Sequence, residues 1–183
     1  MPTLGGLAIY LSFYFSLFIL QPIPFKQVLP LFIASTVIII TGIIDDLIEI
    51  SPKMKLLGIL IAALIIYYVA DIRMDLVTLP LIGKVQLGVF SLPITLIWIL
   101  AITNAVNLID GLDGLATGVS IIALTTMGII GFFFLTIADV AVPIMIFTLV
   151  AAAIGFLPYN FFPARIFLGD TGALFLGFMI SIM

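Results

Sequence analysis

The sequence contains neither cysteine nor histidine, and charged residues make up only 8% of it. Without cysteine the chain has no disulfide, no thiol nucleophile and no thiolate metal site. Without histidine it has no Ser-His-Asp triad, no histidine base and no histidine-ligated zinc of its own. Any chemistry is therefore left to carboxylates, lysines, hydroxyls and amides, together with an oxygen-preferring metal such as Mg²⁺.

Charge is scarce for a soluble protein, whose domains carry about 25% charged residues. Hydrophobic residues make up 64% of the sequence, and apolar runs of about 20 residues, the length that spans a bilayer, recur along it. The composition predicts an all-α fold, a multi-pass transmembrane helical bundle. No basic stretch of the kind that binds nucleic acid is present, so no nucleic-acid partner is expected.

The apolar segments cover residues 4–20, 28–48, 55–70, 92–108, 115–137, 140–157 and 171–183. The first six are long enough, or nearly so, to span a membrane, and the last is shorter. Residues 71–91 alternate between apolar and polar side chains, which predicts a short extramembrane β-hairpin. We expect a single integral membrane domain over residues 1–183, with about six to seven transmembrane segments.

Alternate crossing of the membrane collects the unusual polar residues at one face. That face receives Asp45, Asp46, Lys53, Lys55, Asn107, Asp110, Asp113, Asn160, Arg165 and Asp170. The charges of the hairpin region fall on the opposite face. The six basic residues divide equally between the two faces, so the positive-inside rule does not orient the chain.

The stretch GIIDDLIEISPKMK places Asp45 and Asp46 at the end of a very apolar segment. Two adjacent acids at a helix C-terminus are unfavourable for the helix dipole and for each other, and a nearby metal ion or lysine would relieve this. A solvated helix end would account for one of these acids more easily than for both. Lys53 and Lys55 have two alternative roles: contact with phospholipid headgroups, or binding of a substrate phosphate.

The stretch NLIDGLDGLATG carries two acids three residues apart. On a helix Asp110 and Asp113 would share one face, with Asn107 on that face three residues earlier. The surrounding glycines, which leave room for a backbone or a ligand, are Gly111, Gly114 and Gly118. A glycine-rich turn needs only one such aspartate, whereas acids at membrane depth favour a functional role.

The stretch PYNFFPARIFLGDTGALFLG places Asp170 between two glycines at the start of an apolar segment. A helix N-cap alone would account for Asp170. The functional alternative is a metal carboxylate beside a helix N-terminus, where phosphate binds well. Arg165 fits a phosphate clamp or a headgroup anchor equally.

Together, five aspartates, two asparagines, an arginine and two lysines converge at one face of the bundle. Hard oxygen ligands combined with cations suit Mg²⁺ and phosphate. The convergence predicts a phosphoryl-transfer enzyme that acts on a lipid at the membrane interface.

Four segments also resemble, in order and spacing, the polyprenyl-phosphate N-acetylhexosamine-1-phosphate transferases. They are MPTLGGLAIY, GIIDDLIEISPKMKLL, NAVNLIDGLDGLATG and YNFFPARIFLGDTGALFLG. The resemblance implies that the phosphate of a polyprenyl lipid attacks the β-phosphate of a UDP-amino sugar, with release of UMP. It implies a requirement for Mg²⁺, with Mn²⁺ as a substitute, and a bacterial plasma membrane with this face in the cytoplasm. A homodimer is a further expectation.

The resemblance also suggests individual roles. Asp170 corresponds to a Mg²⁺-ligating aspartate, and Asp45 and Asp46 correspond to a pair held to bind or deprotonate the acceptor phosphate. The set at the nucleotide-sugar and metal site would be Asn107, Asp110, Asp113 and Asn160. Lys55 would bind phosphate, as would Arg165 if it acts as a clamp.

Two features bear on the branch of this family. Ile109 stands where the phospho-N-acetylmuramoyl-pentapeptide transferases of peptidoglycan synthesis usually have threonine, and the stretch between Asp46 and Ser51 is shorter than theirs. Both favour the N-acetylglucosamine branch, which starts teichoic acid and O-antigen synthesis. The pentapeptide transferases remain the alternative.

Three features depart from the family. Its further helices and its histidine-rich motif have no counterpart here, Met1 stands where the family has lysine, and Ile59 where glutamine is common. The chain is therefore expected to lack flanking helices of the full fold. An inactive membrane fragment and a membrane carrier are the alternatives of another class. A CDP-alcohol phosphatidyltransferase is disfavoured because DGLDGLATG lacks the arginine of that family's motif.

Overall fold

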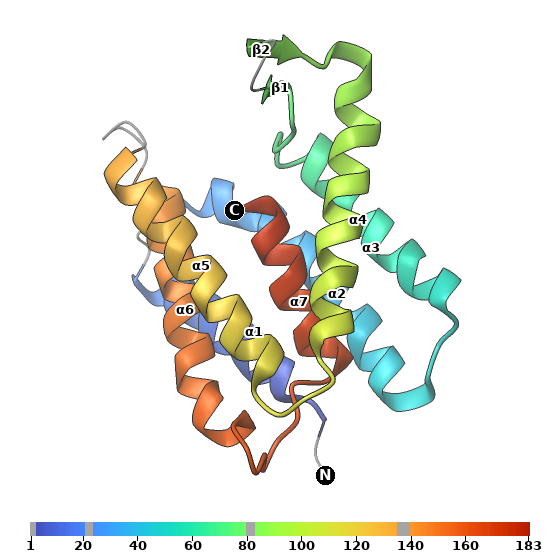
Figure 1. Cartoon of the computed structure of the whole chain (residues 1–183), viewed down its shortest axis with the longest axis vertical. Coiled ribbons are helices and arrows are strands. Elements are labelled where there is room, and N and C mark those ends of the chain that lie inside the picture. The colour runs from blue at the N-terminus through green and yellow to red at the C-terminus, as the bar shows by residue number, and fades with distance from the viewer. Residues whose placement is uncertain (1–2, 21–23, 80–82, 135–139) are drawn as a thin grey trace.

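The computed structural model describes residues 3–20, 24–79, 83–134 and 140–183. Within these residues the chain forms seven α-helices and one two-stranded hairpin (Figure 1). The elements are α1 (Gly5–Leu20), α2 (Phe25–Ile48), α3 (Pro52–Tyr68), β1 (Leu76–Leu79), β2 (Gly83–Gln86), α4 (Ser91–Ile109), α5 (Leu115–Phe134), α6 (Ala141–Asn160) and α7 (Gly169–Ile182), with a 3₁₀ turn at Gly88–Phe90. The predicted helical bundle with a small hairpin is confirmed.

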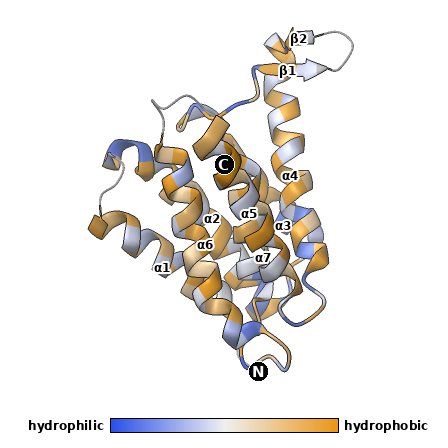
Figure 2. Cartoon of the chain, turned by 60° about the vertical axis from the view of Figure 1, so that its left-hand side comes forward, coloured by the Kyte–Doolittle hydropathy of each residue, from blue (hydrophilic) through white to orange (hydrophobic). Residues whose placement is uncertain are grey.

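Four of the described stretches are long and apolar enough to cross a membrane: Phe25–Ile48, Gly88–Ile109, Leu115–Phe134 and Ala141–Asn160. Helices α1 and α7 are apolar but shorter. Hydrophobic residues run along the helices, and the hydrophilic ones gather mainly in the connections (Figure 2). Large apolar side chains that point outward, as lipid contact requires, include Leu11, Phe15, Ile97, Ile122 and Phe133. The count of six to seven crossings stays a prediction.

Several helix ends differ by a few residues from the predicted segments, for local reasons. Helix α3 begins at Pro52, because proline at the first helical position follows Ser51 in an extended conformation. Helix α2 ends where Glu49 adopts a left-handed conformation, with φ of 49°, and donates its N–H to the carbonyl of Asp45. Helix α6 continues through Pro158 to Asn160. The predicted segment 115–137 ends at Phe134, and residues 135–139 lie outside the described residues.

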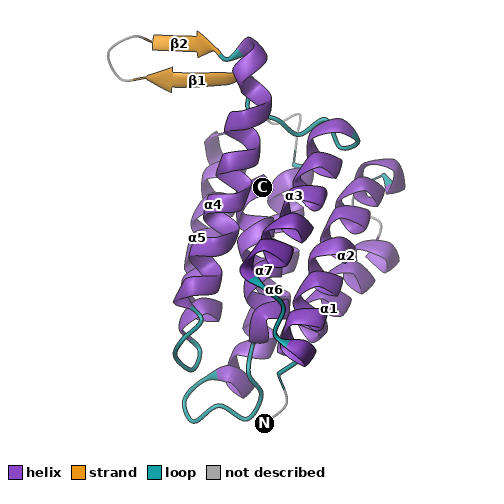
Figure 3. Ribbon diagram, turned by 90° about the vertical axis from the view of Figure 1, so that its right-hand side faces the viewer, coloured by secondary structure: helices purple, strands orange, loops and turns teal. Residues whose placement is uncertain are grey.

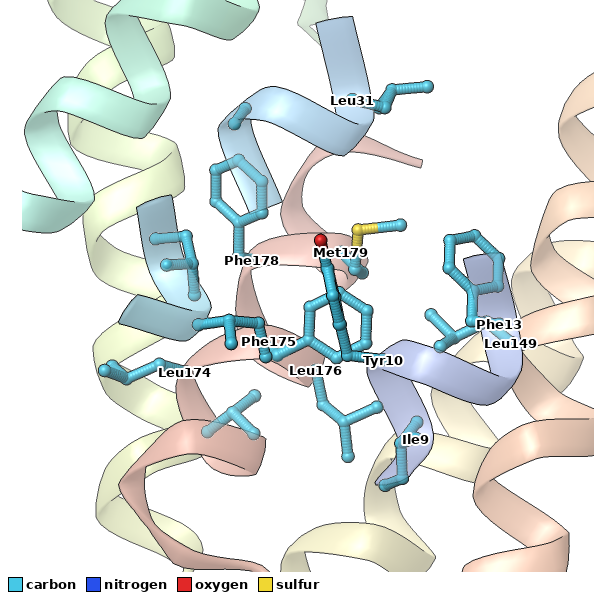
Figure 4. Close-up of a cluster of buried hydrophobic side chains, with 14 of the residues drawn as sticks. Ile9, Tyr10, Phe13, Leu31, Leu149, Leu174, Phe175, Leu176, Phe178 and Met179 are labelled. Carbon is cyan, nitrogen blue, oxygen red and sulfur yellow. The ribbon is translucent and has the colours of Figure 1, made fainter. Parts of the chain in front are cut away.

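Helix α7 lies at the centre of the bundle and packs against α1, α2, α4 and α5. Its side chains Leu174, Phe175, Leu176, Phe178 and Met179 are fully buried. Figure 4 shows Phe175 beside Tyr10 of α1, with Phe13 and Leu149 at the right of the same cluster. The rings of Tyr10 and Phe175 meet edge to face at 5.5 Å between centroids, an arrangement that aromatic pairs favour.

The hairpin projects beyond one end of the bundle (Figure 3). Its strands are antiparallel, with Val77 opposite Val85 and Thr78 opposite Lys84. The nearby charges pair among themselves, since Arg73 lies 3.0 Å from Asp75 and 3.4 Å from Asp71. This end of the molecule therefore has the ordinary ion pairs of an exposed loop.

The α2–α3, α4–α5 and α6–α7 connections meet at the opposite end of the bundle, together with the start of α1 (Figure 1). Backbone hydrogen bonds join the start of α1 to the α6–α7 connection, from Gly5 N–H to the Phe167 carbonyl (3.1 Å) and from Gly6 N–H to the Leu168 carbonyl (3.1 Å). The predicted polar motifs belong to these connections, so the fold gathers them at one end.

Candidate active site

Helix α7 begins against the C-terminal end of α2. The carboxylate of Asp46 accepts hydrogen bonds from the backbone N–H of Asp170 (2.8 Å), from the N–H of Thr171 (3.1 Å) and from the Thr171 hydroxyl (2.6 Å). The first N–H groups of a helix have no partner within the helix. Asp46 therefore caps α7 from another helix, and its charge lies at the positive end of the α7 dipole.

Asp170 is not the N-cap of α7, which was one of the two alternatives for this motif. Helix α7 begins at Gly169, with Leu168 in the capping position, so Asp170 lies within the first turn. The capping carboxylate comes from Asp46 because the α2 end packs directly against this turn. The N–H groups that would otherwise attract a phosphate are already bonded to Asp46.

Asp45, the neighbour of Asp46, points toward α3. It is buried, forms an ion pair with the ammonium of Lys55, and accepts a hydrogen bond from the Ile50 N–H (3.0 Å). The Lys55 ammonium also donates to Oδ1 of Asp170 at 2.7 Å. Of the two cations that the sequence left open, a metal ion or a lysine, a lysine neutralises Asp45, and it bridges α2 to α7.

The motif NLIDGLDG does not form a continuous helix. Helix α4 ends at Ile109, and Gly114 adopts a φ of 71°, which favours glycine. Asp110 and Asp113 therefore lie in a turn between α4 and α5, and the expected shared helical face is wrong. Asp113 accepts a hydrogen bond from the Ala164 N–H (2.9 Å), which joins this turn to the α6–α7 connection.

Asn160, at the end of α6, ties the same connection to α5. Its amide oxygen accepts a hydrogen bond from the Thr117 hydroxyl (2.8 Å), and its amide nitrogen donates to the Ile166 carbonyl (3.1 Å). The side chains of Asn160 and Thr117 are both buried. Asn160 therefore helps to hold one wall of the site in place.

These elements enclose a polar pocket of about 470 Å³, within the range of small-molecule sites. Its described lining consists of Thr3, Asp46, Asn107, Asp110, Gly111, Leu112, Asp113, Asn160, Phe167, Leu168, Gly169 and Asp170. Lys55 adjoins it through its contact with Asp170, and Asp45 through its ion pair with Lys55.

Arg165 is exposed and lines a separate cavity with Tyr159 and Phe162. A larger groove of about 1040 Å³ between α1 and α6 has no charged residue in its described lining.

Uncompensated negative charge is concentrated in the polar pocket. Burial, followed by repulsion from Asp170 and Asp46, raises the pKa of Asp110 to about 6. Among the described residues, no hydrogen-bond donor or ion-pair partner reaches the Asp110 side chain. Asp110 is therefore the carboxylate in the pocket that most readily holds a proton near neutral pH.

The donor chemistry of the pocket suits Mg²⁺, which prefers carboxylate oxygens and is usually held by one or two of them plus substrate phosphates. The mutual repulsion of Asp46, Asp110 and Asp170 would fall if a cation lay among them. Within the described part of the chain no cluster of three acids is arranged to hold a metal by itself. The residues would therefore fit a metal that Asp170 holds and whose remaining ligands come from the substrate.

Two hydroxyl residues of the site were not predicted. Thr171 bonds Asp46, and Thr117 bonds Asn160. Both lie inside the motifs that carry the acids, in LGDTGA and LATG, but a threonine in an apolar segment gives no signal of its own. Their positions beside Asp170 and after Gly114 are the only sequence features that single them out.

The amino-acid sequence is similar to those of known proteins. Residues 28–183 match the family model described as Glycosyl transferase family 4. The chain is 39% identical over 184 residues to a probable undecaprenyl-phosphate N-acetylglucosaminyl 1-phosphate transferase of Bacillus subtilis (strain 168), covering 100% of this chain and 50% of that protein. It is 36% identical over 190 residues to a phospho-N-acetylmuramoyl-pentapeptide-transferase of Clostridium botulinum (strain Eklund 17B / Type B), covering 98% and 58%. The chain thus spans about half the length of the curated relatives it matches.

Proposed function

The chain belongs to glycosyl transferase family 4, and from this premise we propose that it transfers N-acetylglucosamine 1-phosphate from UDP-N-acetylglucosamine to undecaprenyl phosphate, releasing UMP. The observation that carries the proposal is the pocket in which three separate motifs bring Asp46, Asp110 and Asp170 together. Phosphoryl transfer consists mainly of positioning and charge stabilisation, and a pocket of carboxylates with a lysine beside it suits that task. The product would start a cell-wall polymer at the cytoplasmic face of a bacterial membrane.

In the proposed reaction an oxygen of the lipid phosphate bonds to the β-phosphorus of the nucleotide sugar. The bond from that phosphorus to the oxygen bridging the two phosphates breaks, and UMP leaves with that oxygen. Mg²⁺, when bound, would neutralise the charge that accumulates on the diphosphate.

The residues of the chain would share the remaining work. Asp110, with a pKa of about 6, would take the last proton of the acceptor phosphate. Asn107 would donate hydrogen bonds to the nucleotide sugar, and Lys55 would keep Asp170 oriented while it neutralises Asp45. Asp113 and Asn160 would hold the wall formed by the α6–α7 connection. Arg165, exposed beside the site, would contact lipid headgroups.

The position of the pocket also supports a lipid acceptor. It lies at the ends of helices α2, α4 and α6 and the start of α7, where a phosphate at headgroup depth can enter while its chain stays in the bilayer. A carrier would instead be expected to bind its substrate near the midplane, between broken helices.

The pentapeptide transferase activity is the second candidate, because relatives bearing that name are nearly as similar, at 36% and 35% identity. The two activities differ in the sugar nucleotide consumed. An assay that offers UDP-N-acetylglucosamine or UDP-N-acetylmuramoyl-pentapeptide, each with undecaprenyl phosphate, separates them by the donor that yields UMP.

The experiment for the function follows UMP release by the purified chain in detergent, with Mg²⁺ or with EDTA. We expect UMP only with Mg²⁺ and both substrates, and a loss of at least about 100-fold in Asp170→Asn. The proposal fails if neither donor yields UMP, or if the reconstituted chain moves the nucleotide sugar across vesicles without cleaving it. Full Mg²⁺-dependent activity in Asp170→Asn would refute the metal assignment.

A further inference from the structure

We infer that Asp46 is a positioning residue for Asp170, acting through the first turn of α7, rather than a group that touches the substrate. The inference rests on the proposed function only for the role of Asp170. Three donors of that turn converge on the Asp46 carboxylate. An ionised carboxylate offers about four acceptor sites, so three of them are already used within the fold.

The surrounding backbone leaves no room for another capping group. Gly42, one turn before Asp46 on α2, lies so close to Thr171 that a Cβ at Gly42 would overlap the Thr171 backbone. A Cβ at Gly169 would lie 2.8 Å from Oδ2 of Asp46, and Gly169 has a φ of 71°. Thr171 is fully buried, so water cannot replace the carboxylate without opening the α2–α7 contact.

The cap fixes where Asp170 enters the pocket. The Asp170 N–H is bonded to Asp46 of α2 (2.8 Å), and its carboxylate is bonded to Lys55 of α3 (2.7 Å). The lysine is long and rotatable, whereas Asp46 is short and bonded at both oxygens. The backbone of Asp170 is therefore set by Asp46, and its side chain is then steered by Lys55.

The adjacent aspartates thus act on α7 in different ways. Asp45 reaches α7 indirectly, because the lysine that pairs with it also binds Asp170. Asp46 reaches it directly, through main-chain donors. A general base needs an oxygen that is free to approach the proton it removes, and the first turn of α7 already occupies three of the acceptor sites of Asp46.

The test compares Asp46→Asn, Thr171→Val, Thr171→Ser and the double variant Asp46→Asn/Thr171→Val, with Glu49→Gln as the control. Glu49 is an exposed acid at the same end of α2, so its neutralisation changes the charge without touching α7. Two properties are measured on the full chain in detergent: the affinity for Mn²⁺, by electron paramagnetic resonance, and the midpoint of thermal unfolding. Neither requires turnover.

We expect Asp46→Asn and Thr171→Val each to weaken Mn²⁺ binding about 5-fold or more, since each change loosens the turn that positions Asp170. Thr171→Ser keeps the hydroxyl and should bind Mn²⁺ as the unaltered chain does, as should Glu49→Gln. The double variant should lower the midpoint by much less than the sum of the two single changes.

Other results overturn the inference. If Asp46→Asn stops UMP release while Mn²⁺ affinity and the midpoint stay unchanged, Asp46 is a chemical group. Additive changes in the midpoint would mean that Asp46 and Thr171 do not act as a unit. If the unaltered chain binds no Mn²⁺, both the positioning role of Asp46 and the assignment of Asp170 as a metal ligand are wrong. Normal Mn²⁺ binding without UMP release would contradict the proposed function and leave the positioning inference to be decided by the variants.

Discussion

The ammonium of Lys55 lies 2.7 Å from Oδ1 of Asp170, although 115 residues separate the two in sequence. The same ammonium pairs with the buried Asp45. One cation therefore joins the ends of three helices and balances two acids from different motifs. The stability of this end of the bundle should depend on Lys55 more than on any exposed base.

Replacing Lys55 by methionine should destabilise the chain by about 3 kcal/mol, because it leaves the Asp45 carboxylate buried and unpaired. Lys53→Met is the matched control, since Lys53 is exposed on the same turn of α3, and it should change stability by less than about 0.5 kcal/mol. Thermal unfolding in detergent measures both. Adding Asp45→Asn to Lys55→Met should restore part of the loss, and equal effects of the two lysine changes would contradict this account.

The pKa of Asp110, raised to about 6, predicts a pH dependence of the metal-free chain. A carboxyl whose folded-state pKa is raised stabilises the fold while it is protonated, and this contribution is lost as the pH rises through the folded-state pKa. The free energy of unfolding in EDTA should therefore fall between about pH 4 and pH 6, by about 1 kcal/mol once solvent screening is allowed for.

Asp110→Asn should remove this fall without removing the pH dependence that other acids cause. Thermal unfolding of the unaltered chain and of Asp110→Asn, measured at several pH values in EDTA, tests this prediction. Saturating Mg²⁺ should flatten the curve of the unaltered chain toward that of the variant. Identical curves for the two proteins without metal would show that Asp110 ionises normally.

Close backbone packing at Gly42 predicts a second large effect. A Cβ there would overlap the backbone of Thr171, so Gly42→Ala should cost about 3 kcal/mol or prevent folding, as overpacking does. Gly155→Ala on α6 is the control, because a Cβ at Gly155 meets nothing within 4 Å. It should be neutral or stabilising by up to about 1 kcal/mol. Circular dichroism and melting would distinguish the two, and a stable Gly42→Ala would contradict the packing.

The tie between Thr117 and Asn160 predicts a smaller and more local effect. Thr117→Val leaves the buried Asn160 oxygen without its donor, which should cost about 1–2 kcal/mol. Thr126→Val removes a hydroxyl that is exposed and bonds only within α5, and should cost less than about 0.5 kcal/mol. Limited proteolysis of the α6–α7 connection, compared between the two variants, tests whether the loss loosens that wall.

The sequence predicted the helices well because most are long and uniformly apolar, with turn residues between them. Alternation of the segments was enough to place Asp46, Asn107, Asp110, Asp113, Asn160 and Asp170 at one end. The helix boundaries were less accurate because proline acts in opposite ways, beginning α3 at Pro52 but failing to end α6 at Pro158.

The partners of the site residues could not be predicted, since they depend on which helix ends meet. Asp46 and Asp45 look equivalent in sequence, yet one caps α7 and the other pairs with α3. The two arrangements follow from the helical turn between adjacent residues, which directs their side chains to different neighbours. Arg165 was predicted as a substrate-binding residue because of its charge. Its position in the α6–α7 connection instead places it in a separate cavity.

Helix α7 is the last of the described helices to be synthesised, yet it occupies the middle of the bundle and carries Asp170. The four helices that pack against it, α1, α2, α4 and α5, are therefore synthesised before their common neighbour exists. Until α7 arrives, Asp46 has no helix to cap and Lys55 has only Asp45. Ribosomes stalled before residue 169 should hold an open, protease-sensitive assembly, and the addition of α7 should close it.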